Sequence, residues 1–158
     1  MKVGCIGIGW WSDVLEYLLG PVAAVSGRFA QLVLPGDNPD VASVILEHEN
    51  GALSTLNASY ASASEYYLVN IYGKERTAYY DMHSGLRVLR RGESKADPVA
   101  CAENDPIVEE LEEFMRAVRG DGEPEMDGEK STASLAVILA GIKSAREGRR
   151  VTLAEVLQ

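Results

Sequence analysis

Residues 40–61, DVASVILEHENGALSTLNASYA, decide the fold class of this chain. They predict two strands, residues 41–48 and 52–61, because both runs are rich in residues that favour strands. The tripeptide ENG at 49–51 lies between them, and Asn-Gly in that place is a strong hairpin signal. The segment therefore predicts an antiparallel strand pair, not a strand that leads into a crossover helix.

Further strands are predicted on both sides of this hairpin. Residues 22–34 precede it as one strand, and three runs follow it at 66–73, 74–81 and 85–91. Because the connections are short and contain no crossover helix, we expect an α+β fold with one open, mostly antiparallel sheet of about six strands.

Helices are predicted at both ends of the chain. Residues 13–19 read as a helix that Gly20-Pro21 ends. Near the other end, a helix should begin after the N-cap Asp105 and a longer one should run over residues 131–146. The first of these carries an apolar stripe, formed by Ile107, Leu111, Phe114 and Val118. We expect the two C-terminal helices to cover one face of the sheet.

The faces of the predicted strands differ in composition. Side chains alternate between faces along a strand, and one face is apolar: Leu56, Ala58, Tyr60, Tyr67, Val69 and Ile71. The other carries tyrosines, hydroxyls and amides with little charge: Thr55, Asn57, Ser59, Tyr66, Leu68, Asn70 and Tyr72. Aromatic enrichment with loss of charge is typical of an interface core. We expect a subunit interface there; a solvated face is the alternative.

Size and charge exclude several classes of protein. With 158 residues, 46% of them hydrophobic and 25% charged, the chain fits one soluble domain. The net charge of −9 argues against nucleic acid and anionic membranes as partners. The apolar runs are shorter than the roughly 20 residues of a membrane span, and no leader segment is expected. Two isolated cysteines favour a reducing compartment, so we expect a cytoplasmic location.

A weak dinucleotide fingerprint lies at the start of the chain. Residues 2–9 predict a short strand that runs into Gly7 and Gly9, but Ser12 stands where the pattern has its third glycine. The motif also needs a second parallel strand and an acidic residue about 20 positions on. Only one β-α unit precedes the hairpin, so we expect Gly7 and Gly9 to bind no cofactor.

Four segments carry a resemblance to a known family: DVASVILEHENGALSTLNASYA, NIYGKERTAYYD, EELEEFMRAVRG and SLAVILAGIKSAREGRRVTLAEVL. Together, over residues 13–158, they resemble the C-terminal domain of the Gfo/Idh/MocA oxidoreductases, the family of glucose-fructose oxidoreductase and inositol dehydrogenase. The resemblance implies an α+β domain with helices on one sheet face and a subunit interface on the other. Residues 1–12 are similar to the first strand and glycine turn of the same family's Rossmann domain.

The resemblance implies that most of the Rossmann domain is missing between those two parts. The family's Glu-Lys-Pro segment, whose lysine serves in proton transfer, does not occur. The full-length family uses NAD or NADP, and we expect no cofactor and no catalytic residue in this chain. It is then a non-catalytic substrate and oligomerisation domain that forms a homodimer or higher homo-oligomer. The alternative is a sugar or polyol dehydrogenase whose nucleotide-binding domain another chain supplies.

One substrate-binding residue is implied. The family carries a His-x-x-Asp pattern in the helix that leads into EYLLG; Asp13 matches its aspartate, and Trp10 replaces its histidine. A carboxylate that merely stabilises the start of a helix is the other interpretation of Asp13. A small-molecule carrier with a pocket near Trp10, Trp11 and Asp13 is a third possibility for the chain.

No metal site is predicted. His48 follows Glu47 on a strand and so alternates away from it, and we expect this histidine to be exposed or at an interface. Asp81 and His83 flank a turn and could share a face, but a zinc site needs at least three protein ligands.

Overall fold

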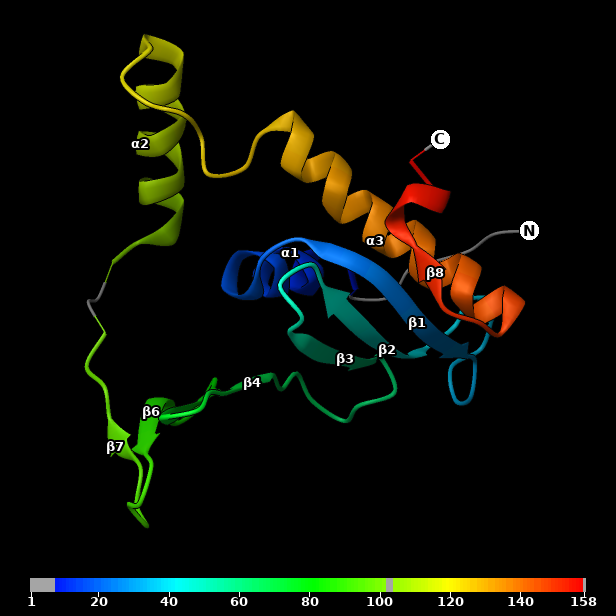
Figure 1. Ribbon diagram of the computed structural model, residues 1–158, viewed down its shortest axis with the longest axis horizontal. Helices are drawn as coiled ribbons and strands as arrows, with labels where there is room; N and C mark the ends of the chain where they lie inside the picture. Colours follow the sequence, from blue (N-terminus) through cyan, green and yellow to red (C-terminus); the bar gives the residue numbers. More distant parts are fainter. Residues whose placement is uncertain (1–7, 102–103, 158) are drawn as a thin grey trace. The chain divides into compact units, whose positions relative to one another are not determined.

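The structure, a computed structural model, describes residues 8–101 and 104–157. Within these residues the chain forms three α-helices, eight strands and one 3-10 turn (Figure 1). The α+β class with antiparallel strands is confirmed. In chain order the elements are α1 (Ile8–Leu19), β1 (Val22–Ala30), β2 (Val41–His48), β3 (Leu53–Ser59), β4 (Leu68–Tyr72), β5 (Arg76–Asp81), β6 (Gly85–Arg90), β7 (Asp97–Pro98), α2 (Pro106–Arg119), α3 (Gly128–Glu147), β8 (Val151–Thr152) and η1 (Leu153–Glu155).

The strands form two sheets. Unit 1 of the chain, Met1–Ser62 with Pro124–Gln158, holds a sheet of order β3-β2-β1-β8, and unit 2, Ala63–Glu123, holds one of order β4-β5-β6-β7. The sequence predicted a single sheet of about six strands. The difference arises between β3 and β4, where the alanines and glutamate of ASASE at 61–65 are poor strand formers. The units are described separately below.

The hairpin that decided the fold class has the predicted form. β2 covers 41–48 as predicted, and β3 is antiparallel to it, with Val44 opposite Leu56. Gly51 in the connecting turn has φ +86°, a conformation that favours glycine. Along β3 the side chains of Thr55, Asn57 and Ser59 are exposed while the residues between them are buried or half-buried, as the alternation predicted.

The core of unit 1 lies between this sheet and helix α3. Its largest fully buried apolar side chains are those of Val25, Val44, Leu46, Val137 and Val151. A Cβ added to Gly27 in β1 would lie 3.0 Å from Val44 Cγ1 and 3.2 Å from the Gly141 carbonyl oxygen of α3. The absence of a side chain at these two glycines thus lets β1 and α3 approach closely, and α3 packs along β1 (Figure 1).

Helix α1 is longer than predicted. It begins at Ile8 instead of residue 13, because Ser12 is fully buried and Leu15 packs against the core, which extends the buried side of the helix backwards. Of the strand predicted at 2–9, Ile8 and Gly9 lie in α1 instead, and residues 2–7 lie outside the described residues. The division into 1–12 and 13–158 stays a prediction, and α1 runs across it.

In unit 2, strands β4 to β7 form an antiparallel meander, and helix α2 follows. As predicted, Asp105 caps α2 and accepts hydrogen bonds from the N–H groups of Ile107 and Val108. Gly120 ends the helix in the left-handed conformation. None of the residues of α2 is buried, in contrast to α3. No helix in the described part of the chain combines the length and the apolar character that a bilayer span requires.

Candidate functional site

Helix α1 presents two carboxylates toward the interior of unit 1. Asp13 and Glu16 are three residues apart and therefore share one side of the helix. Helix α1 is in contact with α3, β2 and β3, and Glu16 is hydrogen-bonded to Ser134 of α3. Asp13 Oδ1 is buried and has no hydrogen-bond partner among the described residues. An acceptor in this state is destabilising unless something donates to it.

Glu16 joins three elements through its carboxylate. The Ser134 hydroxyl of α3 donates to Oε2 at 3.0 Å, and the Val22 N–H at the start of β1 also donates to the carboxylate. Burial raises the pKa of Glu16 above its ordinary value of 4.5; the hydrogen bond from Ser134 opposes this, and the negative charge of Asp13 adds to it. The two carboxylates therefore form a site where protonation and hydrogen bonding are coupled.

The hairpin β2–β3 fastens the C-terminal end of α1. His48 Nδ1 donates to the Gly20 carbonyl at 2.7 Å, and the Ser54 hydroxyl lies 2.9 Å from Nε2. Asn50 Nδ2 donates to the Leu19 carbonyl at 2.7 Å. These bonds satisfy carbonyls that a helix end otherwise leaves open. They hold the helix that carries Asp13 and Glu16 against the sheet.

The expectation for His48 was wrong, because this side chain is 4% exposed. His48 has the same parity in β2 as Val44 and Leu46, so alternation directs it into the core. A buried imidazole needs two partners, and Gly20 and Ser54 provide them. The pattern of apolar side chains along β2 could have identified this orientation.

Replacing Glu16 by glutamine should remove a pH dependence of stability. A raised pKa in the folded protein means that the contribution of Glu16 is fully present below the unfolded pKa and is lost as the pH rises through the folded pKa. The free energy of unfolding of the unchanged protein, relative to Glu16→Gln, should therefore fall as the pH rises from 4.5. Urea unfolding at a series of pH values measures this difference.

Ser134→Ala is the companion variant, because it removes a hydrogen bond that lowers the pKa of Glu16. In this variant the pKa of Glu16 is raised further, so the fall in the free energy of unfolding should continue to higher pH. A difference between the unchanged protein and Glu16→Gln that stays constant from pH 4 to 8 would contradict the coupled site.

The other positions considered near the start of the chain either lie outside the described residues or do not join the cluster of Asp13 and Glu16. Gly7 lies outside the described residues, while the backbone of Gly9 and Trp10 lies in α1. Trp11 is half-buried on the same helix. The side chain of Trp10, which replaces the histidine of the family pattern, is not among those described. Asp13 is thus the predicted site residue that the structure places in a cluster of functional groups.

Asp81 and His83 are placed for a structural role. The Asp81 carboxylate accepts hydrogen bonds from the N–H groups of His83 at 3.0 Å and Ser84 at 2.8 Å, and it pairs with Arg87 at 3.2 Å. This carboxylate therefore shapes the β5–β6 turn. Across residues 8–101 and 104–157, no group of three or more potential ligands is placed to hold a metal ion.

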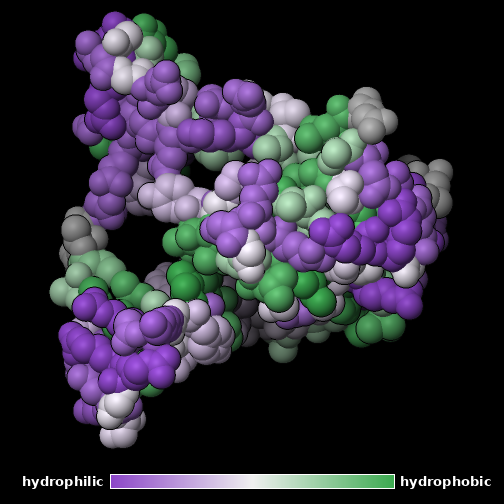
Figure 2. All heavy atoms as spheres, in the orientation of Figure 1, coloured by the Kyte–Doolittle hydropathy of each residue, from purple (hydrophilic) through white to green (hydrophobic). Residues whose placement is uncertain are grey.

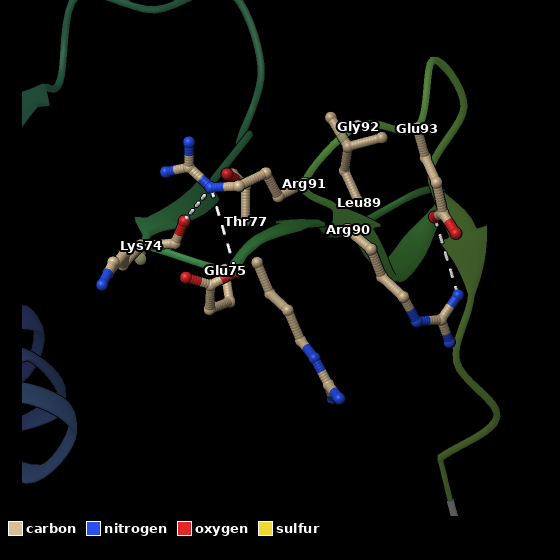
Figure 3. A pocket seen from close by; sticks show the side chains of 10 residues that line it. Lys74, Glu75, Thr77, Leu89, Arg90, Arg91, Gly92 and Glu93 are labelled. Carbon is tan, nitrogen blue, oxygen red and sulfur yellow. Dashed lines mark hydrogen bonds and ion pairs between the residues drawn. The ribbon is translucent and has the colours of Figure 1, made fainter.

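A hollow of about 190 Å³ lies at one end of the unit 2 sheet (Figure 3). Cations line it, but Figure 3 shows their side chains pointing apart. Arg91 Nε donates to the Lys74 carbonyl at 2.7 Å, and Arg90 lies 3.6 Å from Glu93. Because these groups do not converge on one point, the α1 cluster is the stronger candidate site.

Comparison with known proteins identifies related domains. The profile of the Gfo/Idh/MocA oxidoreductase family, C-terminal alpha/beta domain, matches residues 12–153. The D-apiose dehydrogenase of Paraburkholderia graminis is 29% identical over 157 residues, which cover 89% of this chain and 42% of that protein.

Solved structures agree with this match. An oxidoreductase from Desulfitobacterium hafniense superposes with a TM-score of 0.86 at 28% identity, over 95% of this chain and 48% of that one. The WlbA dehydrogenase from Bordetella pertussis, in complex with NADH and UDP-GlcNAcA, gives a TM-score of 0.70 at 26% identity, over 91% of this chain and 42% of that one. The chain thus spans less than half the length of these three relatives.

Proposed function

Because this chain belongs to the Gfo/Idh/MocA oxidoreductase family, we propose that it acts as the substrate and oligomerisation domain of such an oxidoreductase and transfers no hydride on its own. The observation that carries the proposal is the match of residues 12–153 to the C-terminal domain of the family. A cytoplasmic location is part of the proposal, and the exposed free thiol of Cys101 suits a reducing compartment.

The described strands support the absence of hydride transfer. A nicotinamide dinucleotide is held by parallel β-α-β units, with its pyrophosphate at a glycine-rich turn before a helix. The strand pairs within residues 8–101 and 104–157 are antiparallel. Gly9 lies inside α1 instead of in a turn. The Glu-Lys-Pro segment, whose lysine the family resemblance assigns to proton transfer, does not occur in the sequence.

Asp13 is the proposed substrate-binding residue. Its buried Oδ1 has no donor within residues 8–101 and 104–157, and the hydroxyl of a sugar or polyol would supply one. Glu16 beside it is held by Ser134 and Val22, so Asp13 is the carboxylate with an oxygen left to bind a ligand. The D-apiose dehydrogenases among the relatives make D-apiose the first sugar to test.

Asp13→Ala should weaken the binding of D-apiose about 10- to 100-fold, because a hydrogen bond to a charged group contributes roughly 1.5–3 kcal/mol. Isothermal titration of the purified chain measures this affinity. Asp37→Ala removes an exposed carboxylate of the loop before β2 and serves as the control. Equal affinities for Asp13→Ala and the unchanged chain would contradict the assignment.

The self-association rests on the tyrosine face, which we define as Tyr66, Leu68, Asn70 and Tyr72. Tyr66, Leu68 and Tyr72 are each more than half exposed, and the face carries no charge along β4. A solvated face would normally carry lysine and glutamate, whereas interface cores are aromatic and poor in charge. Light scattering over a dilution series should give a mass of at least twice the 17.1 kDa of one chain. A mass of one chain at micromolar concentration would contradict this part of the proposal.

A second candidate is a working half-enzyme that receives its nucleotide-binding domain from another chain. The unsatisfied oxygen of Asp13 favours it, because a substrate-binding group is useful where hydride transfer follows. Tight binding of NADH that appears only when such a domain is added would distinguish this candidate from a purely structural module.

A further inference from the structure

Asn50, in the turn between β2 and β3, ties this turn to helix α1 within unit 1. Its Nδ2 donates to the Leu19 carbonyl at 2.7 Å, and its Oδ1 accepts from the Ala52 N–H at 2.9 Å. We call the bond between Asn50 and Leu19 the α1 latch; it joins residues 31 positions apart in the sequence. Figure 2 shows polar and apolar residues intermixed over unit 1, so hydropathy does not mark this turn, whereas its hydrogen bonds do.

The residue after Asn50 makes its side-chain amide chemically unstable. Asparagine is among the thermolabile residues, and Gly51 has no Cβ to hinder an approach to it. The Gly51 nitrogen can attack Cγ of Asn50, so that a new N–C bond forms and the Cγ–Nδ2 bond breaks. Ammonia leaves with the proton of the Gly51 N–H, and water opens the resulting cyclic imide to aspartate or isoaspartate. The net change exchanges ammonia for water and needs no oxidant or reductant.

The closed turn restrains the atoms that would react. The Gly51 N–H donates to the His48 carbonyl at 2.9 Å, which holds the attacking nitrogen in the turn. The nitrogen that must leave is held by the Leu19 carbonyl. Both bonds have to open before the attack can occur, and helix ends and turns open locally at low cost compared with global unfolding. The reaction should therefore be slow in the closed turn and follow each opening of it.

The product of the reaction cannot restore the α1 latch. An ionised carboxylate only accepts hydrogen bonds, so an aspartate at position 50 would place an acceptor against the Leu19 carbonyl, which is also an acceptor. Its negative charge would lie beside the C-terminal end of α1, where the helix dipole disfavours it. Isoaspartate would also lengthen the backbone of the turn, in which the His48 N–H donates to the Ala52 carbonyl at 2.9 Å.

We propose that Asn50 is a deamidation site, and that its conversion irreversibly releases the C-terminal end of α1 from the β2–β3 hairpin. The hydrogen bond from His48 to the Gly20 carbonyl remains as an attachment of that end. The helix is then loosened and not detached. This inference concerns contacts within unit 1, and it stands whether or not Asp13 binds a sugar.

Peptide mapping by mass spectrometry tests the modification. The full chain is incubated at mildly alkaline pH, folded or unfolded in guanidinium chloride, and the exchange of amide nitrogen for oxygen is followed at each asparagine. Asn50 should convert several-fold more slowly in the folded chain than in the unfolded one. Asn57, which alanine follows, is the internal control and should stay largely unconverted. A folded chain in which Asn50 converts as fast as in the unfolded one, or not at all over a much longer incubation, would overturn the proposal.

Amide hydrogen exchange tests the release of α1. The Gly20 N–H donates to the Glu16 carbonyl at 2.8 Å in the last turn of the helix, and its exchange reports on that turn. Asn50→Asp imitates the product and should speed this exchange several-fold. Asn57→Asp is the matched control, because it changes the charge of the same hairpin but keeps the acceptor for the Ser43 hydroxyl. Equal exchange at Gly20 in the two variants would overturn the proposal.

Asn50→Ala separates the loss of the latch from the added charge. It removes the donor to Leu19 without placing a carboxylate beside the helix end. Its Gly20 exchange should lie between that of the unchanged chain and that of Asn50→Asp. Exchange as slow as in the unchanged chain would show that the latch does not hold the end of α1, against the proposal.

Discussion

Leu46→Ala is expected to lower the free energy of unfolding by about 2 to 5 kcal/mol. Leu46 is 0% exposed and lies in the middle strand pair of unit 1, opposite Val25 of β1. Alanine removes buried methyl groups and leaves a cavity that the packed strands around it fill only in part. His48 lies on the same face of β2, so the change also weakens the packing around the residue that holds the C-terminal end of α1. Urea unfolding measures the loss as a lower midpoint with an unchanged slope.

Ile45→Ala is the matched control, since it removes a similar volume from the adjacent residue. Ile45 is 47% exposed on the opposite face of β2. We expect it to lose about 1 kcal/mol or less, because changes at exposed positions are usually small. Equal losses for the two variants would contradict the assignment of the buried face of the hairpin.

Tyr72→Lys is expected to weaken self-association at least about 30-fold, which corresponds to the roughly 2 kcal/mol of an interface hot spot. Tyr72 is 74% exposed and makes an edge-to-face contact with Tyr79 across the β4–β5 pair. Lysine removes the aromatic surface and brings a charge into the proposed interface, where it must lose its hydration. Light scattering over a dilution series gives the dissociation constant of each variant.

Glu75→Gln, in the exposed turn after β4, controls for the change in net charge, because it also raises the net charge of the chain by one. It should associate like the unchanged chain. Equal weakening by both variants would show that overall charge, and not the tyrosine face, governs association.

The local elements were predictable because local chemistry determines them. The Asn-Gly turn and the two alternating runs around it define β2 and β3, and Asp105 with Gly120 defines the ends of α2. The division into two sheets was not predictable in the same way. Pairing depends on contacts between distant segments, and the weak strand formers at 61–65 read equally well as a connection within one sheet.

The candidate site was predictable only in part. The family pattern singled out Asp13, but Glu16 has no signal of its own in the sequence. Its role arises because the fold brings Ser134 of α3, 118 positions away, to its carboxylate. His48 was predicted to be exposed or at an interface on the basis of its acidic neighbours. Its position on the same face of β2 as Val44 and Leu46, which are buried, was the better indicator. Asn50 was recognised as a turn residue, whereas its bond to the Leu19 carbonyl of α1 depends on tertiary structure.

The proposal that this chain lacks hydride transfer of its own is tested most directly by titrating the purified chain with NADH and following nucleotide fluorescence. Enzymes that use a substrate or cofactor bind it typically between about 1 μM and 1 mM. We predict no saturable binding up to about 1 mM, a concentration that corresponds to only about 4 kcal/mol of binding free energy. Saturation in the micromolar range by this chain alone would contradict the account.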